Sequence, residues 1–170
     1  APRNGNELAF RNQFYTPRYV VEFLTDNTLG RTWYEMCQGN TRLVETCQYL
    51  IQPSTPTPLP MGEGQGVRDK CDPRAPRILD PACGSGHFLL YAFDLLETIY
   101  QEAYVDPDLG PNLQEAYPDE ASFRRAVPGL ILKHNLHGID IDLRAAQIAA
   151  LALWLRAQRS FTNLKIPARQ

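Results

Sequence analysis

The stretch Ile78–Leu90, which reads ILDPACGSGHFLL, decides the predicted fold. A short apolar run ends at Asp80, small residues follow, and from Phe88 the apolar spacing becomes helical. This is the order of a strand, a tight turn and a helix start, where parallel α/β sheets bind nucleotides. Gly84 and Gly86 carry no Cβ, so the backbone there can adopt unusual dihedral angles and approach a ligand closely. The stretch therefore predicts an α/β protein with a ligand site at this turn.

Two kinds of group in the turn suit a polar ligand. The first N–H groups of the helix have no partners within the helix and can donate to a ligand. Asp80, at the carboxyl end of the expected strand, suits an ammonium group better than a phosphate. A nicotinamide-binding loop needs the pattern G-x-G-x-x-G, but counting from Gly84 the third glycine position is occupied by Leu89. The spacing therefore argues against a dehydrogenase.

Composition restricts the remaining classes of protein. A chain of 170 residues with 44% hydrophobic and 21% charged residues is typical of one soluble globular domain. A net charge of −2 and a pI of about 5.9 do not favour a surface that holds DNA tightly by itself. No apolar run approaches the roughly 20 residues of a membrane span, and residues 1–6 lack the core of a signal peptide. We therefore expect a cytoplasmic protein without membrane contact.

The four cysteines do not predict a metal site. Cys37, Cys47, Cys71 and Cys83 contain no C-x-x-C pair, and no histidine pair has zinc-finger spacing. Cys83 belongs to the glycine-rich turn, and the other three are interpreted as incidental thiols of a reducing cytosol. Their number alone leaves a disulfide open.

The glycine-rich turn resembles the first motif of the amino-methylating DNA methyltransferases, whose signature is D-P-x-C-G-S-G-x-F. That signature is complete from Asp80 to Phe88. In this family the loop wraps the methionine end of S-adenosylmethionine (AdoMet). The residues to which the resemblance gives a cofactor contact in this turn are Asp80, Ala82, Gly84, Ser85, Gly86 and Phe88.

A second segment, residues 10–24, reads FRNQFYTPRYVVEFL and resembles the F-Y-T-P-x-x-V-V segment that precedes the glycine motif in the same group. Taken alone, it predicts a capped amphipathic helix, with Thr16 as N-cap and Pro17 in the first helical position. In the family the Tyr-Thr-Pro turn closes over the methionine carboxylate of the cofactor. The resemblance gives this role to Tyr15 and Thr16.

A second strand and helix are predicted nearer the carboxyl end. Residues 135–143, NLHGIDIDL, predict a short strand ending in acids, and residues 144–155 predict a helix that Asp142 could cap. A carboxylate after the second strand commonly accepts hydrogen bonds from ribose hydroxyls. In the methyltransferase pattern G-h-[DE]-h-[DN], the resemblance assigns this role to Asp140 and places Ile141 against the adenine face. The alternative is that Asp140 only caps a turn or faces solvent.

The spacing between the two acid-bearing corners departs from a simple Rossmann unit. Asp140 follows Gly86 by 54 residues, whereas the usual interval is roughly 20. We therefore expect residues 105–133 to be an insertion with its own helix, as in larger restriction–modification methylases. That helix is predicted to begin near Asp119 and to end before Pro128, because proline lacks the backbone donor.

No catalytic residue is assigned, because the motif [DNS]-P-P-[YFW], through which these enzymes engage the target amino group, does not occur in the chain. The resemblance implies a single AdoMet-binding module, cut before that motif, with a Rossmann-like class I AdoMet-dependent methyltransferase fold. We expect a partial parallel sheet with flanking helices. Its expected parts are a Tyr-Thr-Pro helix segment (1–30), an irregular or helical insert (31–75) and two β–α units (76–170).

The function implied by the resemblance is that of the AdoMet-binding part of an N6-adenine DNA methyltransferase, gamma class, from a restriction–modification or BREX phage-defence system. The parent enzyme would act on specific sites in double-stranded DNA, with specificity or nuclease subunits or domains as partners. The chain by itself is expected to be inactive. Two alternatives stay open: a non-catalytic cofactor-sensing or scaffolding subunit of a defence complex, and a methyltransferase acting on RNA or protein glutamine.

Overall fold

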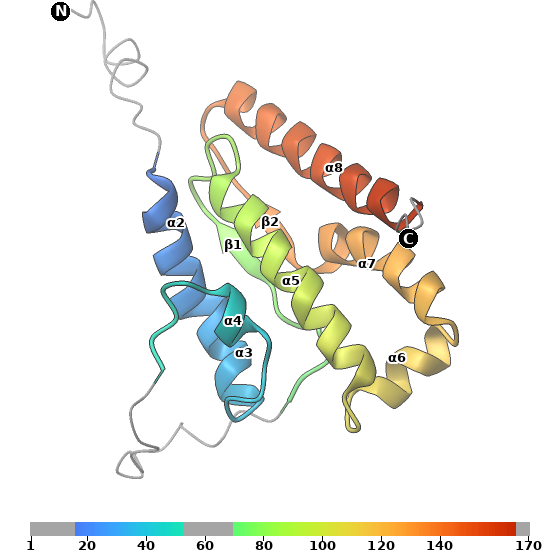
Figure 1. Ribbon diagram of the computed structural model, residues 1–170. Helices are drawn as coiled ribbons and strands as arrows, with labels where there is room; N and C mark the ends of the chain where they lie inside the picture. The colour runs from blue at the N-terminus through green and yellow to red at the C-terminus, as the bar shows by residue number, and fades with distance from the viewer. Residues whose placement is uncertain (1–15, 53–69, 166–170) are drawn as a thin grey trace, which may run out of the picture.

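The computed structural model describes residues 16–52 and 70–165 (Figure 1). Over these ranges the chain is an α/β structure, mainly helical, with a two-stranded parallel sheet. The helices are α2 (Arg18–Thr25), α3 (Arg31–Met36), α4 (Leu43–Thr46), α5 (His87–Val105), α6 (Gly110–Ala116), α7 (Glu120–His134) and α8 (Leu143–Lys165), with a π-helix η1 (Asp26–Gly30) directly after α2 and the strands β1 (Ile78–Asp80) and β2 (Leu136–Gly138).

The two strands bring distant parts of the sequence to one edge of the sheet. β1 and β2 run parallel, with Asp80 opposite Gly138, and residues 81–135 form the crossover that parallel neighbours require. Pairing continues past the strands, because the N–H of Ile139 donates to the Asp80 carbonyl (2.9 Å) and the N–H of Cys83 donates to the Ile139 carbonyl (3.0 Å). The chain segments that follow the two strands therefore meet.

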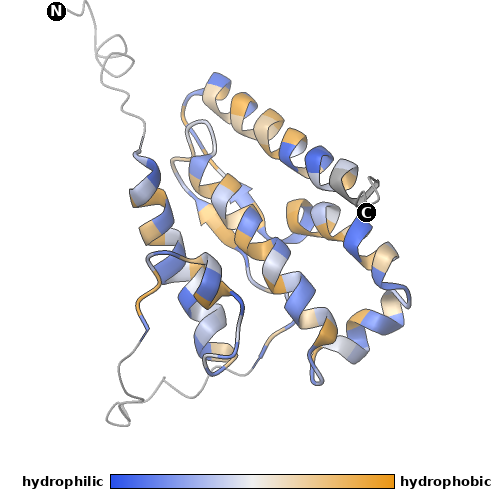
Figure 2. Cartoon of the chain, in the orientation of Figure 1, coloured by the Kyte–Doolittle hydropathy of each residue, from blue (hydrophilic) through white to orange (hydrophobic). Residues whose placement is uncertain are grey.

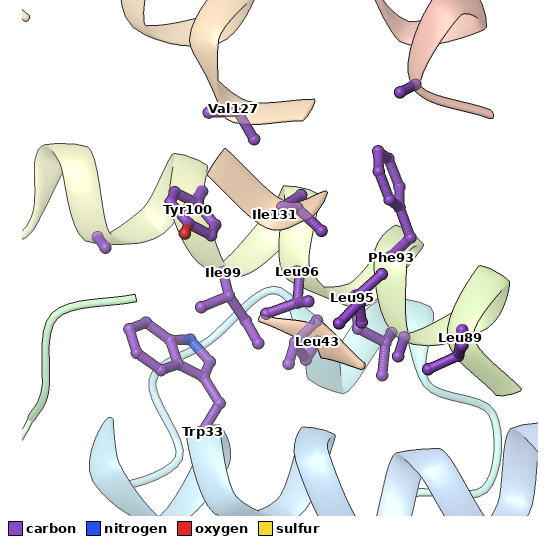
Figure 3. Packing of buried hydrophobic residues seen from close by; sticks show 14 of the residues in the cluster. Trp33, Leu43, Leu89, Phe93, Leu95, Leu96, Ile99, Tyr100, Val127 and Ile131 are labelled. Carbon is purple, nitrogen blue, oxygen red and sulfur yellow. The ribbon is translucent and has the colours of Figure 1, made fainter. Parts of the chain in front are cut away.

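Helix α5 is the centre of the hydrophobic core. Its apolar residues recur at helical spacing and lie between the amino-terminal helices on one side and α7 on the other (Figure 3). Burial of each large apolar side chain contributes roughly 1.5–3 kcal/mol. The buried side chains include Leu89, Phe93, Leu96 and Ile99 of α5, Trp33 of α3, Leu43 of α4, and Val127 and Ile131 of α7.

The crossover between α5 and β2 contains two helices, α6 and α7. Asp119 caps α7 by accepting a hydrogen bond from the N–H of Ser122 at 2.9 Å. The prediction that this helix ends before Pro128 is wrong, because α7 continues through that residue. The proline removes one hydrogen bond to the preceding turn, but its ring is fully buried and its neighbours Val127 and Ile131 are buried as well. Tertiary packing therefore outweighs the local cost.

The start of both strands is fixed by the buried side chain of Asn135. Its Nδ2 donates to the carbonyls of Pro73 (2.8 Å) and Pro76 (2.7 Å), which lie just before β1. Its Oδ1 accepts from the hydroxyl of Tyr100 on α5 at 2.9 Å. A residue at the head of β2 thus holds the approach to β1 against α5, at the amino ends of the two strands and away from the glycine-rich turn that follows β1.

Helix α8 packs on α5 and α7 through small side chains, and several of its larger apolar residues are exposed. Figure 2 shows hydrophobic segments along this helix. Ala149, Ala157 and Ser160 are buried, and Arg156 pairs with two acids of α5. Within residues 16–52 and 70–165, no helix has both the length and the apolarity needed to cross a membrane. The large apolar side chains of α8 that are more than half exposed are Leu143, Ile148, Leu151, Trp154 and Leu155.

Candidate cofactor site

The glycine-rich turn (Asp80–Gly86) connects β1 to α5, and its two glycines differ in what a side chain in their place would meet. Gly84 and Gly86 both have left-handed backbones, with φ of +52° and +89°. A Cβ on Gly86 would lie 3.0 Å from the Cβ of Ala149 on α8, whereas a Cβ on Gly84 would meet nothing within 4 Å. Gly86 therefore allows α8 to approach the turn, and Gly84 leaves open space above it.

Asp80 has one satisfied and one unsatisfied carboxylate oxygen. Its Oδ1 accepts a hydrogen bond from the N–H of Ala82 at 3.2 Å. Its Oδ2 is buried and has no hydrogen-bond partner, and no other buried side-chain oxygen or nitrogen in the described part of the chain is left in this state. An unpaired buried carboxylate oxygen is energetically costly, so it is a strong acceptor for a cationic group that binds beside it.

Asp140, just after β2, forms hydrogen bonds both to the glycine-rich turn after β1 and within its own turn. Its Oδ2 accepts from the N–H of Gly84 at 2.8 Å, and its Oδ1 accepts from the N–H of Asp142 at 2.8 Å. Asp142, and not Asp140, caps α8: its Oδ1 accepts from the N–H of Arg144 at 3.0 Å. This confirms the predicted cap. Asp140 therefore caps its own turn and also contacts the glycine-rich turn.

The two hydrogen bonds to Asp140 predict a pH-dependent change in the turn. The N–H groups of Asp142 and Gly84 hold the pKa of Asp140 below its ordinary value of 3.8, because they stabilise the charged form. This contribution to stability is fully present above that ordinary value and is lost as the pH falls through the lower pKa of the folded state. We expect the amide proton resonance of Gly84 to titrate with a midpoint below pH 3.8 in nuclear magnetic resonance spectra. If the same titration persists in Asp140→Asn, another carboxylate is responsible.

Two hollows flank the junction between α2 and α5. One, of about 630 Å³, lies beside β1 and is lined by Asp80 and Phe88 together with Thr25 and Leu29 from the amino-terminal helices. The other, of about 440 Å³, lies at the start of α5. Its lining residues include Thr16, Arg18, Glu22, His87, Tyr91 and Asp94.

Thr16 lies near the glycine-rich turn but not in the predicted role of a helix cap. That prediction is wrong, because α2 begins at Arg18 and the cap position is Pro17, which has no side-chain acceptor. The Pro17 carbonyl accepts from the N–H groups at the start of the helix. Thr16 instead lines the same hollow as His87, so the starts of α2 and α5 are neighbours (Figure 1). Tyr15 lies outside the described residues.

The other predicted contact residues surround the turn with different exposure. Ala82 is exposed, Phe88 is half-buried and Ile141 is 94% exposed, so its side chain is available to a ligand. The hydroxyl of Ser85 lies 3.0 Å from Nδ1 of His87. His87, at the variable position of the motif, therefore contacts a candidate cofactor residue, which its motif position alone did not reveal.

Residues 73–167 match the family described as the MmeI DNA-methyltransferase domain. The match covers more than half of the chain and includes both strands and both acid-bearing corners. The chain belongs to this family. Membership confirms the resemblance to DNA methyltransferases that the motif around Asp80 indicated.

Two curated relatives align with most of this chain. The adenine-specific methyltransferase BrxX of Escherichia coli O9:H4 (strain HS) is 32% identical over 157 residues, and the adenine-specific methyltransferase PglX of Lacticaseibacillus casei (strain Zhang) is 29% identical over 160 residues. Each alignment covers 91% of this chain but only 12% of the relative. The putative type II restriction enzyme and methyltransferase RM.MjaORFECS2P of Methanocaldococcus jannaschii is 42% identical over 79 residues, which are 46% of this chain and 6% of that protein.

None of the four cysteines of the chain forms a disulfide in the structure. Cys37, Cys47, Cys71 and Cys83 are free, which answers the question that their number left open. Burial raises the pKa of the Cys83 thiol in the glycine-rich turn, so it is a packing residue rather than a reactive one. Among the described residues, no three His, Cys, Asp or Glu side chains are arranged to hold a metal ion.

Proposed function

We propose that this chain is the AdoMet-binding part of an adenine-specific DNA methyltransferase of a restriction–modification or BREX-type phage-defence system. The family supports methyl transfer to DNA, and the names of BrxX and PglX support adenine as the target. The observation that carries the cofactor assignment is the buried, unpartnered Oδ2 of Asp80 beside the turn that Asp140 holds.

The chemical groups of AdoMet fit the residues around the turn. The buried Oδ2 of Asp80 would accept a hydrogen bond from the ammonium group of AdoMet. The positive charge of that group would strengthen the hydrogen bond to the carboxylate. Thr16, with Tyr15 preceding it, would receive the methionine carboxylate near the start of α5. Asp140 would accept hydrogen bonds from the ribose hydroxyls, and the exposed Ile141 would lie against the adenine ring. The remaining contacts would come from Ala82, Gly84, Ser85, Gly86 and Phe88.

Asp140 can hold the turn and a ribose at the same time. Each of its oxygens accepts one backbone N–H, from Gly84 or from Asp142. A carboxylate has about four acceptor positions, so two remain for hydroxyl donors. The carboxylate therefore keeps the turn in its binding conformation before the cofactor arrives, which reduces the entropy lost on binding.

The methyl group that AdoMet supplies would be transferred to the amino nitrogen of an adenine turned out of the DNA helix. In this proposal the residues of this chain would position the donor, and residues outside it would engage the base, since the chain spans only 12% of BrxX and of PglX. The hollow beside β1 and the 57% exposed Leu79 leave that edge of the sheet open. We propose that further strands complete a Rossmann-like sheet there, and that residues 1–30, 31–75 and 76–170 keep the division expected from the sequence.

The cofactor assignment is tested by titration calorimetry of AdoMet on the whole protein. We expect micromolar binding by the wild type and at least about tenfold weaker binding by Asp140→Ala, because hydrogen bonds to a charged group contribute roughly 1.5–3 kcal/mol. The matched control is Asp142→Ala, which removes the cap of α8 but leaves the Asp140 carboxylate in place. Wild-type affinity in Asp140→Ala would remove the ribose assignment, and no binding by the wild type would remove the cofactor assignment.

A methyl-transfer assay with labelled AdoMet distinguishes a DNA methyltransferase from the two alternative functions. A catalytic protein should label double-stranded DNA that contains adenine, whereas a cofactor-sensing subunit should bind AdoMet without labelling any substrate. Labelling of RNA or of a protein glutamine in place of DNA would favour the third hypothesis.

A further inference from the structure

A buried acid lies outside the glycine-rich turn and has no part in the proposed function. Asp26, the first residue of η1, is 0% exposed. Its Oδ1 accepts from the hydroxyl of Tyr91 at 2.7 Å, and its Oδ2 accepts from the N–H of Tyr49 at 3.0 Å. No cation is among these partners. Burying a carboxylate against neutral donors is costly, and apolar side chains of similar volume often stabilise a core as well or better.

The position of this acid connects the two segments that are proposed to bind AdoMet. Asp26 directly follows α2, the helix that begins just after Thr16. Tyr91 lies one turn after His87, at the start of the helix that leaves the glycine-rich turn. Both Tyr91 and Thr16 line the hollow at the start of α5. The hydrogen bond between the Tyr91 hydroxyl and Asp26 therefore ties the two helices together close to the proposed site.

The backbone around Asp26 is built to hold this geometry. The wide turns of π-helices are frequent at functional sites, and η1 presents two consecutive side chains to the segment after α4. Asn27 donates through Nδ2 to the Tyr49 carbonyl at 2.7 Å and accepts at Oδ1 from the N–H of Ile51 at 3.0 Å. Asp26 and Asn27 thus bind the backbone of residues 49–51, which gives part of the 31–75 insert a bracing role.

We infer that Asp26 and Tyr91 are positioning residues whose hydrogen bond sets how closely the Thr16 segment approaches the glycine-rich turn. The inference rests on the proposed function, because its consequence is the affinity for the methionine end of AdoMet. Neither side chain is assigned a contact with the cofactor, and both act through α2 and α5. Burial and the neighbouring Asp26 carboxylate also raise the pKa of Tyr91 well above its ordinary value, so the hydroxyl stays a donor at physiological pH.

Tyr91→Phe tests the inference, with Tyr100→Phe as the matched control. Both changes remove one hydroxyl from α5, but Tyr100 donates to Asn135 at 2.9 Å and does not face α2. In the whole protein, Tyr91→Phe should raise the KM and Kd for AdoMet about fivefold and leave kcat within about twofold, as expected for one hydrogen bond used in positioning. Tyr100→Phe should leave both constants unchanged.

A double variant separates positioning from folding. Tyr91→Phe alone removes one of the two hydrogen-bond donors of a buried carboxylate, so it also lowers the stability of the fold. Asp26→Asn combined with Tyr91→Phe removes the buried charge and keeps an oxygen acceptor for the N–H of Tyr49, so it should restore the melting temperature without restoring the affinity for AdoMet. Recovery of wild-type affinity in the double variant would overturn the inference.

Hydrogen exchange gives a measurement that does not depend on AdoMet. Amides of α2 should exchange faster in Tyr91→Phe than in the wild type or in Tyr100→Phe. Equal α2 exchange and equal AdoMet affinity in Tyr91→Phe and the wild type would overturn the inference, and so would an equal rise of KM in Tyr100→Phe. If the wild type does not bind AdoMet at all, the proposed function fails, while the exchange of α2 still decides whether the pair positions this helix.

Discussion

Gly86→Ala should lower the free energy of unfolding by about 2–5 kcal/mol. A left-handed backbone costs a non-glycine residue roughly 1–2 kcal/mol, and φ at Gly86 is +89°. The new Cβ would also lie 3.0 Å from the Cβ and 3.2 Å from the Cα of Ala149, so α8 would have to move. Overpacking of this kind adds roughly 1–3 kcal/mol. Urea unfolding followed by circular dichroism measures the loss.

Gly84→Ala is the control, because it shares the backbone penalty without the clash. Gly84 has a φ of +52°, and a Cβ there would meet nothing within 4 Å. This variant should lose only roughly 1–2 kcal/mol of stability. Its methyl group would nevertheless enter the open space above the turn, so the affinity for AdoMet should fall more than the stability does. Equal destabilisation by the two alanines would mean that the contact with α8 does not explain Gly86.

The local parts of the site could be predicted from the sequence because short-range rules determine them. The acid that ends β1, the glycines after it and the cap of α8 by Asp142 each depend on neighbours within a few residues. Asp140 lies beside Gly84 because the carboxyl ends of parallel strands meet at the same edge of a sheet. These are features for which local preference and tertiary structure agree.

The features that could not be predicted depend on partners far away in the sequence. Asp26 reads as an ordinary surface acid of an amphipathic helix, and nothing local connects it with Tyr91, 65 residues later. Pro128 should end a helix by its own chemistry, but its ring is buried in the core. The π-helix likewise has no sequence signature in DNTLG, and its two polar side chains find their partners only in the folded chain.

Asp80→Asn should lower the affinity for AdoMet about 10- to 100-fold, because a charge-assisted hydrogen bond contributes roughly 1.5–3 kcal/mol. The amide keeps an oxygen for the N–H of Ala82 but loses the negative charge that the ammonium group would meet. Stability in the absence of AdoMet should be unchanged or higher, since the variant removes a buried carboxylate oxygen that has no partner.

Asp140→Asn is the comparison variant for Asp80→Asn. Its carboxylate already accepts two backbone hydrogen bonds, so this variant should lose stability as well as affinity. Titration calorimetry and thermal unfolding of both variants distinguish an acid kept for a ligand from an acid that also holds the turn. If Asp80→Asn destabilised the protein and bound AdoMet like the wild type, Asp80 would be a structural residue, and the cofactor's ammonium group would need another partner.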